Sequence, residues 1–250
     1  MILIGILAVA IVFDVAVRRN WRLAILLVAR WKSLRPFVLA YLRRSPATFA
    51  YLVVLSVTTW VLLGTSPKVS KLVLLEHSTN LHELRINPIK VLIRSAFWAP
   101  GYEFLAWIFF FALVLAPAEY WLGTRRWVLV FATGHVLATV GSVTALWFAI
   151  RYGWAAKNLQ ETIDVGVSYG FAAVAAIFTY RLPPSWRWAW ALSTVGIGLV
   201  ALVVNQSFTD VGHFLALGVG FAFYPITRDF WVQSRKATPI WSTIASKGLA

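Results

Sequence analysis

The chain has 250 residues, of which 60% are apolar and only 13% are charged, and its net charge is +14. A soluble globular chain carries about 25% charged residues, so this chain has too few to cover a water-facing surface. The composition argues against a soluble enzyme and excludes a disordered tail, which needs low hydrophobicity and high charge. Cysteine is absent, which excludes a disulfide framework and a Cys-based zinc site. These observations predict an integral membrane protein.

Seven segments are long and apolar enough to be considered as membrane spans, each of which needs about 20 residues. Serine, proline and glycine separate them; Ser45 and Pro46, for example, predict an N-cap followed by a first-turn proline. Tryptophans near many of the boundaries are typical of a membrane interface. The predicted spans are residues 1–17, 46–63, 101–118, 127–150, 165–180, 186–204 and 211–226.

The basic residues gather in alternate connections between these spans. Sixteen of the 23 Lys and Arg residues lie in residues 18–44, 119–126, 181–187 and from 228 onward, and seven lie in the other connections. By the positive-inside rule the first set faces the cytoplasm. We therefore expect a protein of the plasma (inner) membrane with its N-terminus outside and its C-terminus in the cytoplasm. The distribution explains the net charge without nucleic acid as a partner.

The N-terminal part differs from the rest of the chain. Residues 1–17 lack a basic n-region and an Ala-x-Ala exit, so we interpret them as an additional hydrophobic helix rather than a cleaved signal peptide. Residues 20–44 place Trp, Arg and Lys among apolar residues, which predicts an interfacial helix on anionic lipid. The predicted organisation is an N-terminal segment 1–45, a membrane domain 46–226 with an outer loop 65–100, and a cytoplasmic tail 227–250.

A serine and a histidine are predicted at the same depth on two different helices. Both helices enter the membrane from the outer side, with Ser168 roughly 6 Å and His213 roughly 5 Å inside, at 1.5 Å per residue. Polar ionisable groups within spans are costly and usually face the bundle interior. By the same count His135 lies about 12 Å from the cytoplasmic edge, so we expect it to bond a neighbouring helix instead.

Small residues accompany both of these side chains. A Gly-x-Ser-x-Gly run that starts at Gly166 surrounds Ser168, and Ala216 and Gly220 continue the helix face of His213. The run imitates the nucleophile elbow of α/β-hydrolases, but the strand and soluble sheet of that fold are missing. Small faces let membrane helices pack closely, which predicts hydrogen-bonding distance between the serine and the histidine. The alternative is a packed helix pair whose polar side chains only bond each other.

Two aspartates begin the helices that carry these residues. Asp164 and Asp210 are both suited to be N-caps. Asp210 is also three residues before His213, so its carboxylate and the imidazole share a helix face, and the carboxylate can orient the ring. Both interpretations stay open at this point.

Several features together resemble the rhomboid family. From residue 46 onward there are six predicted spans, with a long outer loop after the first of them. The glycine-flanked Ser168 lies on the fourth of these spans and His213 lies on the sixth. A Ser-Ala-Phe-Trp run from Ser95 precedes the second of these spans, and a Glu-x-x-x-Gly-x-Arg turn from Glu119 follows it. The resemblance covers residues 46–226. It implies an all-α polytopic membrane protein, a six-helix rhomboid-like bundle with an additional N-terminal hydrophobic helix.

The resemblance also implies an activity, that of an intramembrane serine endopeptidase. Ser168 would be the nucleophile and His213 the general base, with backbone N–H groups near the serine as part of an oxyanion hole. The substrates would be transmembrane segments of other membrane proteins, cleaved near the outer face. The chain departs from the family where a His-x-x-x-Asn motif is usual: Glu103 and Trp107 occupy those positions. Tyr169 replaces the usual glycine after the serine.

Three functions follow from these observations. The first is proteolysis, the second is a catalytically inactive rhomboid-like protein that binds transmembrane segments, and the third is a small transporter. No inverted repeat or broken-helix pair supports transport. The expected partners are membrane proteins with transmembrane segments and the lipid bilayer. No cofactor or metal is expected, because the histidines and carboxylates lie on different helices without ligand spacing.

Overall fold

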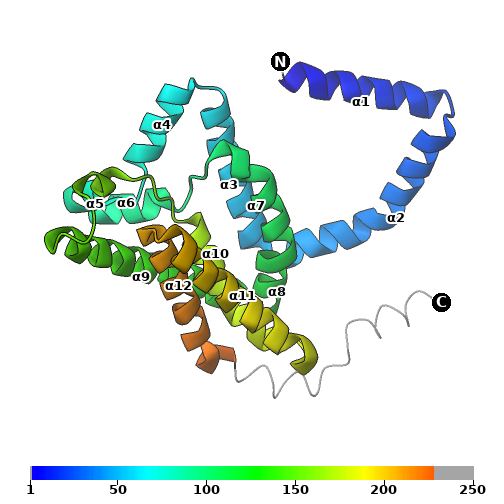
Figure 1. Cartoon of the computed structure of the whole chain (residues 1–250). Coiled ribbons are helices and arrows are strands. Elements are labelled where there is room, and N and C mark those ends of the chain that lie inside the picture. The colour runs from blue at the N-terminus through cyan, green and yellow to red at the C-terminus, as the bar shows by residue number, and fades with distance from the viewer. Residues whose placement is uncertain (1, 228–250) are drawn as a thin grey trace. The chain divides into compact units, whose positions relative to one another are not determined.

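The protein is all-α throughout the described residues. The computed structural model describes residues 2–227, with side chains for all of these except residues 2–6 and 102. The chain divides into two compact units, one that ends at Arg44 and one that begins at Ser45. The predicted cytoplasmic tail lies almost wholly outside the described residues. Figure 1 shows the course of the chain.

The first unit contains two helices. Helix α1 (Ile2–Arg18) is apolar, and its exposed Asp14 and Arg18 form an i,i+4 ion pair at 2.7 Å. Helix α2 (Arg22–Arg44) exposes most of its residues, and its basic side chains lie among them. The predicted hydrophobic helix and the predicted interfacial helix therefore both form as helices.

The second unit is built from six helical segments and a structured outer loop. The first four segments are α3 (Pro46–Leu63), a continuous run from η1 to α8, α9 (Thr124–Arg151) and α10 (Val167–Phe178). The run consists of η1 (Gly101–Glu103), α7 (Phe104–Phe110), η2 (Phe111–Leu115) and α8 (Ala116–Leu122). The last two segments are α11 (Pro184–Asn205) and α12 (Phe208–Ala222). Short 3-10 turns η3 (Lys157–Glu161), η4 (Thr179–Arg181) and η5 (Tyr224–Thr227) complete the described chain. The predicted six-helix bundle is confirmed.

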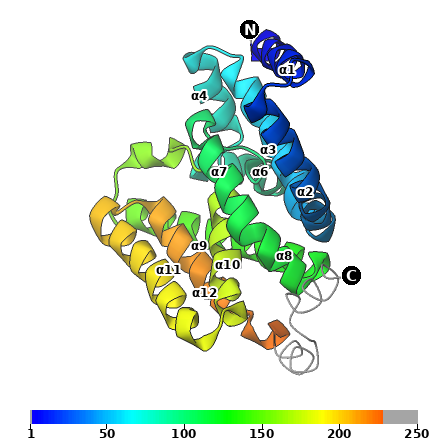
Figure 2. The ribbon, with the colours of Figure 1, turned by 90° about the vertical axis from the view of Figure 1, so that its right-hand side faces the viewer.

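Four of these segments are long and apolar enough to cross a membrane: α3, the run from Phe104 to Leu122, α9 and α11. Helices α10 and α12 are shorter, with 12 and 15 residues, and α10 is buried along most of its length. It packs against both α9 and α12 (Figure 1). Helix α11 is mostly exposed and lies at an edge of the bundle (Figure 2). Helix α10 therefore sits within a bilayer because α9 and α12 pack around it, and not because it is long enough to span one by itself.

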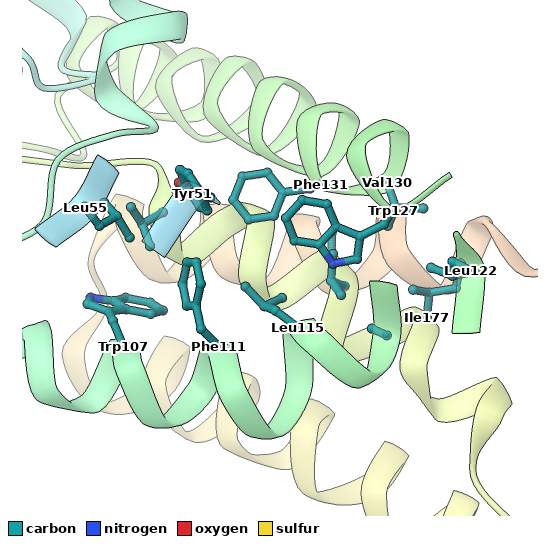
Figure 3. Close-up of a cluster of buried hydrophobic side chains, with 14 of the residues drawn as sticks. Tyr51, Leu55, Trp107, Phe111, Leu115, Leu122, Trp127, Val130, Phe131 and Ile177 are labelled. Carbon is teal, nitrogen blue, oxygen red and sulfur yellow. The ribbon is translucent and has the colours of Figure 1, made fainter. Parts of the chain in front are cut away.

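Aromatic side chains form the core between α3, α7, η2 and α9. Tyr51 makes ring contacts with Phe111 and Phe131 at 5.3 and 5.2 Å, and Trp127 stacks on Phe131 at 5.3 Å (Figure 3). The Tyr51 hydroxyl donates to the carbonyl of Ala96, which is how this buried polar atom is satisfied. The core thus fixes α3 and α9 against the α7–η2 segment, which leads to the candidate functional site described below.

A buried carboxylate holds the start of α3 against α8. The carboxylate of Glu119 on α8 accepts from the backbone N–H groups of Ala47 and Thr48, at 3.0 and 2.7 Å. It also accepts from the Thr124 hydroxyl at 2.7 Å. Ser45 is the N-cap residue of α3, as predicted, but its hydroxyl donates to the Ala116 carbonyl of α8 instead of accepting from an N–H group of α3. Glu119 therefore satisfies the free N–H groups that begin α3.

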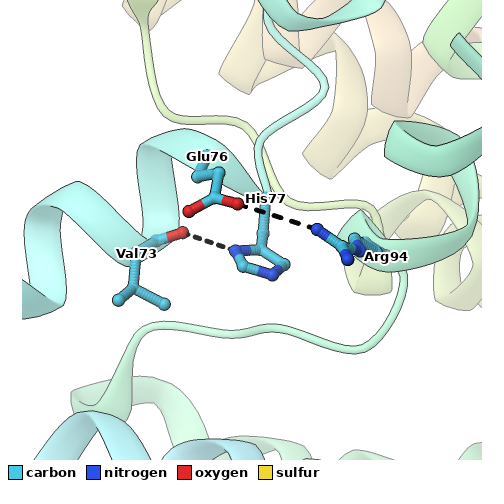
Figure 4. A network of polar contacts seen from close by, with 4 residues as sticks. All are labelled: Val73, Glu76, His77 and Arg94. Carbon is cyan, nitrogen blue, oxygen red and sulfur yellow. Dashed lines mark hydrogen bonds and ion pairs between the residues drawn. The ribbon is translucent and has the colours of Figure 1, made fainter. Parts of the chain in front are cut away.

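Residues 65–100, the predicted outer loop, are folded. It contains α4 (Pro67–Glu76), α5 (Leu81–Ile86) and α6 (Pro88–Ser95). An ion pair at 3.7 Å joins Glu76 to Arg94, and His77 Nδ1 contacts the Val73 carbonyl at 2.8 Å (Figure 4). The ion pair links the end of α4 to α6, and the His77 contact lies within the C-terminal turn of α4.

Candidate functional site

Ser168 and His213 line the same cavity, which we call the outer cavity because the sequence predicts that this end of the bundle faces outward. Ser168 is the second residue of α10, His213 lies in the second turn of α12, and both are half-buried. The cavity has a volume of about 500 Å³. Its other polar lining residues are Glu103, Trp107, Asp164 and Thr209, and its apolar lining residues are Leu74, Ala99, Pro100, Ile163, Val165 and Val167.

The same two residues also line a second, apolar cavity of about 410 Å³. This groove lies between the α7–η2 segment, α10, α11 and α12, and its walls include Phe110, Phe171 and Ile197. Ile197 is 72% exposed, so the groove is open at the lateral surface of the bundle. Ser168 and His213 therefore lie where an outer polar cavity meets an apolar groove.

No direct hydrogen bond joins the Ser168 hydroxyl to the His213 imidazole among the described contacts. The sequence predicts hydrogen-bonding distance between them, and the structure brings them only as far as a shared cavity. Such bonds are often long in a site without substrate and shorten when substrate binds. Ser168 and His213 therefore share two cavities without a hydrogen bond between them among the described contacts.

The glycines around the serine pack α10 against α9. A Cβ at Gly166 would overlap the imidazole of His135, and a Cβ at Gly170 would overlap the ring of Phe131. The sequence predicts that these glycines let the helix that carries His213 pack closely against the helix that carries Ser168. This prediction is wrong, because both glycines contact residues of α9. Ser168, two residues from each glycine, lies on another face of α10 and lines the cavities.

The close approach of α12 to α10 depends on its own small residues. A Cβ at Gly220 would overlap the Ala173 carbonyl oxygen, and a Cβ at Gly212 would overlap the Tyr169 ring. Ala216, between these two glycines, is fully buried. The small-residue stripe therefore begins at Gly212, and His213 lies beside the stripe rather than on it.

Tyr169 connects the serine helix to the histidine. Its ring is edge-on to the imidazole of His213, with ring centroids 5.1 Å apart. Its hydroxyl donates to the carboxylate of Asp164 at 2.8 Å, and the residue is fully buried. In the sequence Tyr169 stands out only as a departure from a glycine. The signal that identifies its role is Gly212, which leaves space for the tyrosine ring.

Asp164 anchors the outer loop instead of capping α10. Its carboxylate accepts from the Thr79 hydroxyl at 2.8 Å as well as from Tyr169, and Gly166 occupies the N-cap position of α10. The hydroxyl of Ser78 accepts from the Asp164 N–H at 2.6 Å. Burial raises the pKa of the Asp164 carboxyl, and the bonds from Tyr169 and Thr79 oppose that rise. The capping interpretation of Asp164 is wrong.

Asp210 does belong to a helix cap, although not as the N-cap residue itself. Ser207 is the N-cap of α12, and its hydroxyl accepts from the Asp210 N–H at 3.2 Å. The Asp210 carboxylate accepts from the Ser207 N–H at 3.4 Å, which completes a capping box, and it also accepts from the Ser207 hydroxyl at 2.5 Å. A contact between this carboxylate and the His213 ring is not among the hydrogen bonds of the described residues.

Glu103 and Trp107 contact each other at the cavity wall. The indole N–H of Trp107 donates to Glu103 Oε2 at 3.2 Å, and both residues line the outer cavity with Ser168. Trp107 is buried, and its ring packs edge-on against Phe171 at 5.8 Å. The site therefore contains a carboxylate, Glu103, close to the serine and the histidine.

His135 bonds the outer loop, in agreement with the expectation that it contacts a neighbouring helix. Its Nε2 contacts the Leu92 carbonyl at 2.8 Å and the Ser95 hydroxyl at 3.4 Å, both on α6. Within residues 2–227, no three His, Cys, Asp or Glu side chains group closely enough to hold a metal ion.

Comparison with known proteins identifies the family. A family model described as "Rhomboid-like protein" matches residues 40–233. The chain belongs to the rhomboid-like family. Neither the search of curated proteins nor the search of solved structures finds a match. The match covers the whole six-segment bundle of this rhomboid-like protein, including Ser168 and His213.

We expect the Tyr169 hydroxyl to stabilise this rhomboid-like bundle without being needed for the ring contact with His213. Tyr169→Phe removes one hydrogen bond to a buried carboxylate and keeps the ring against Gly212, so the free energy of unfolding should fall by about 1–3 kcal/mol. Thermal unfolding in detergent measures this loss. Tyr152→Phe, at an exposed tyrosine after α9, is the matched control and should leave the unfolding temperature unchanged. Equal behaviour of the two variants would contradict the role assigned to the hydroxyl.

Proposed function

We propose that this rhomboid-like protein is an intramembrane serine endopeptidase that cleaves transmembrane segments of other membrane proteins near the outer face. The observation that carries the proposal is that Ser168 and His213, on separate helices, line both an outer polar cavity and an open apolar groove. A peptide bond can be cleaved at such a junction, because the groove suits an apolar segment and the cavity suits water. The family membership supports the same reaction class.

In the proposed reaction the Ser168 hydroxyl attacks the carbonyl carbon of the scissile bond and gives its proton to His213. The imidazolium then protonates the leaving amine, and the acyl group stays on the serine. Water, activated by His213, hydrolyses that ester and regenerates the serine. Each step transfers one proton through the same imidazole, so no metal or cofactor is required.

The start of α10 supports the developing negative charge. Ser168 lies in the first turn of this helix, where backbone N–H groups lack acceptors within the helix and the helix dipole is positive. N–H groups in such a position stabilise an oxyanion without having to reorganise. Glu103 has the opposite effect, because an ionised carboxylate in the same cavity repels the oxyanion.

The groove supports the choice of substrate. Its lining is almost entirely apolar, with aromatic and aliphatic side chains from the α7–η2 segment and from α11. Helix α11 is the most exposed of the four candidate spans, so it has few contacts to break if a segment is inserted beside it. We propose that substrate segments reach Ser168 between α7–η2 and α11. The distribution of basic residues supports an outward-facing cavity in the plasma (inner) membrane.

The experiment uses the protein reconstituted in lipid vesicles with a model transmembrane substrate that carries a fluorescent label at each end. Wild type should release two fragments cut near the outer end of the segment, and Ser168→Ala should release none. Ser56→Ala is the matched control, because Ser56 lies on α3 and its hydroxyl donates only to the Leu52 carbonyl. Binding of the segment by wild type without any fragment would overturn proteolysis in favour of a non-catalytic binder.

A further inference from the structure

The outer cavity is acidic in a protein with a strongly positive charge. The chain carries 23 Lys and Arg residues against nine Asp and Glu, yet none of the residues that line the cavity is Lys or Arg. Two carboxylates, Glu103 and Asp164, line it together with Ser168 and His213. Within the described part of the chain, the cavity lining therefore offers no Lys or Arg side chain to pair with these carboxylates.

Of these two carboxylates, only Glu103 has capacity left for a ligand. Asp164 is 3% exposed, and its Oδ2 accepts from both Thr79 and Tyr169. Glu103 is half-buried, and the one hydrogen bond that its carboxylate accepts among the described residues comes from the Trp107 indole N–H, to Oε2. A carboxylate has about four lone-pair positions, so Glu103 can accept further hydrogen bonds from a ligand in the cavity.

A substrate segment that covers the cavity takes water away from Glu103. Burial of an unpaired carboxylate is costly, and the cost falls when an opposite charge with hydrogen bonds accompanies it. The same cation also removes the repulsion between Glu103 and the oxyanion on the substrate. One positive charge on the substrate therefore lowers the cost of burying the Glu103 carboxylate and also offsets the repulsion between that carboxylate and the oxyanion.

The cavity walls suit the side chains that carry such a charge. Lys and Arg bury their methylene stems along apolar surface and keep the charged head at a polar group. Leu74, Ile163 and Val165 provide that surface, and Glu103 provides the polar group. An Arg guanidinium can also use both carboxylate oxygens.

We propose that Glu103 binds a Lys or Arg side chain of the substrate, and that the protein selects transmembrane segments with a basic residue at the outer flank of the cleaved bond. The inference rests on the proposed function, because it assigns the substrate of that same site. Basic residues are less frequent on the outer side of membrane proteins than on the cytoplasmic side. A requirement for a basic residue at the outer flank of the cleaved bond therefore restricts cleavage to a minority of transmembrane segments.

The first arm of the test measures cleavage. The substrates are model segments that differ only at one of the four positions on the outer side of the cleaved bond. At each of these positions in turn, one segment carries Lys, one carries Gln and one carries Glu. At one of these positions wild type should cleave the Lys segment with a kcat/KM about tenfold above that of the Gln segment, with the Glu segment slowest. Glu103→Gln, which keeps an acceptor for Trp107, should abolish the preference, and Glu103→Lys should reverse it.

Glu76→Gln is the matched control for a general effect of surface charge. Glu76 is a carboxylate on the same side of the bundle, its side chain is 62% exposed, and it does not line the cavity. It should leave the preference for the Lys segment intact. Equal cleavage of the Lys, Gln and Glu segments by wild type would overturn the inference, and this result does not depend on whether any variant folds.

The second arm measures binding and separates the inference from the proposed function. Fluorescent Lys and Glu segments are titrated against the Ser168→Ala protein and the Ser168→Ala, Glu103→Gln protein in nanodiscs. Tighter binding of the Lys segment that depends on Glu103 supports the inference even if wild type cleaves nothing, in which case proteolysis alone fails. Cleavage by wild type without any charge preference leaves proteolysis standing and overturns the inference.

Discussion

Replacing His213 with alanine should lower kcat/KM for a transmembrane substrate by about 10³–10⁴-fold. The imidazole is the proposed acceptor of the Ser168 proton and the donor to the leaving amine, and a positioned general base contributes rate factors of this size. The loss should fall on kcat, because the apolar groove that holds the segment stays in place. Initial rates of fragment release in lipid vesicles, over a range of substrate density, measure both parameters.

His82→Ala is the matched control for this experiment. His82 lies on α5 of the outer loop, is exposed, and lines neither cavity. It should cleave within about twofold of wild type. If folded His213→Ala cleaves within tenfold of wild type, the imidazole is not the base, and the dyad is wrong even if Ser168 is the nucleophile.

Replacing Gly220 with alanine should destabilise the bundle by about 3 kcal/mol, the upper end of the usual cost of overpacking. A Cβ there would overlap the backbone carbonyl of Ala173 and the Cβ of Ala176, and backbone cannot move aside as a flexible side chain can. Helices α10 and α12 would have to separate, which also separates Ser168 from His213. The unfolding temperature in detergent should fall by roughly 5–10 °C.

Gly218→Ala tests whether contact, rather than the loss of a glycine, is responsible. Gly218 lies on the same helix, two residues away on an exposed face, and a Cβ there meets no atom within 4 Å. Alanine is the better helix former by about 1 kcal/mol, so this variant should be as stable as wild type or slightly more stable. Similar destabilisation by both variants would contradict the close packing of α10 and α12.

The helical architecture could be predicted because the signals for it are local. Runs of apolar residues, Pro46 at the start of α3 and Gly64 at its end mark helices without any knowledge of their neighbours. The fold class and the family follow from such runs together with a few spaced motifs. The predicted span 165–180 is longer than α10, which begins at Val167 and passes into the 3-10 turn η4 at Thr179.

The partners of individual polar residues could not be predicted from the sequence. Asp164 has the position of an N-cap, and only the fold brings Ser78 and Thr79, more than 80 residues away, to its side. Glu119 satisfies the N–H groups of α3, 71 and 72 residues distant. Counting helical rise predicted equal depth for Ser168 and His213, and the two residues line one cavity. Their chemical roles stay predictions.

The central claim is that Ser168 is an activated nucleophile, and covalent labelling tests it most directly. Detergent-purified protein is treated with a fluorophosphonate, digested and mapped by mass spectrometry. The account predicts one phosphonyl group, on Ser168, that is absent from both Ser168→Ala and His213→Ala. A folded wild-type protein that takes up no label, or takes it up on another serine, would contradict the account.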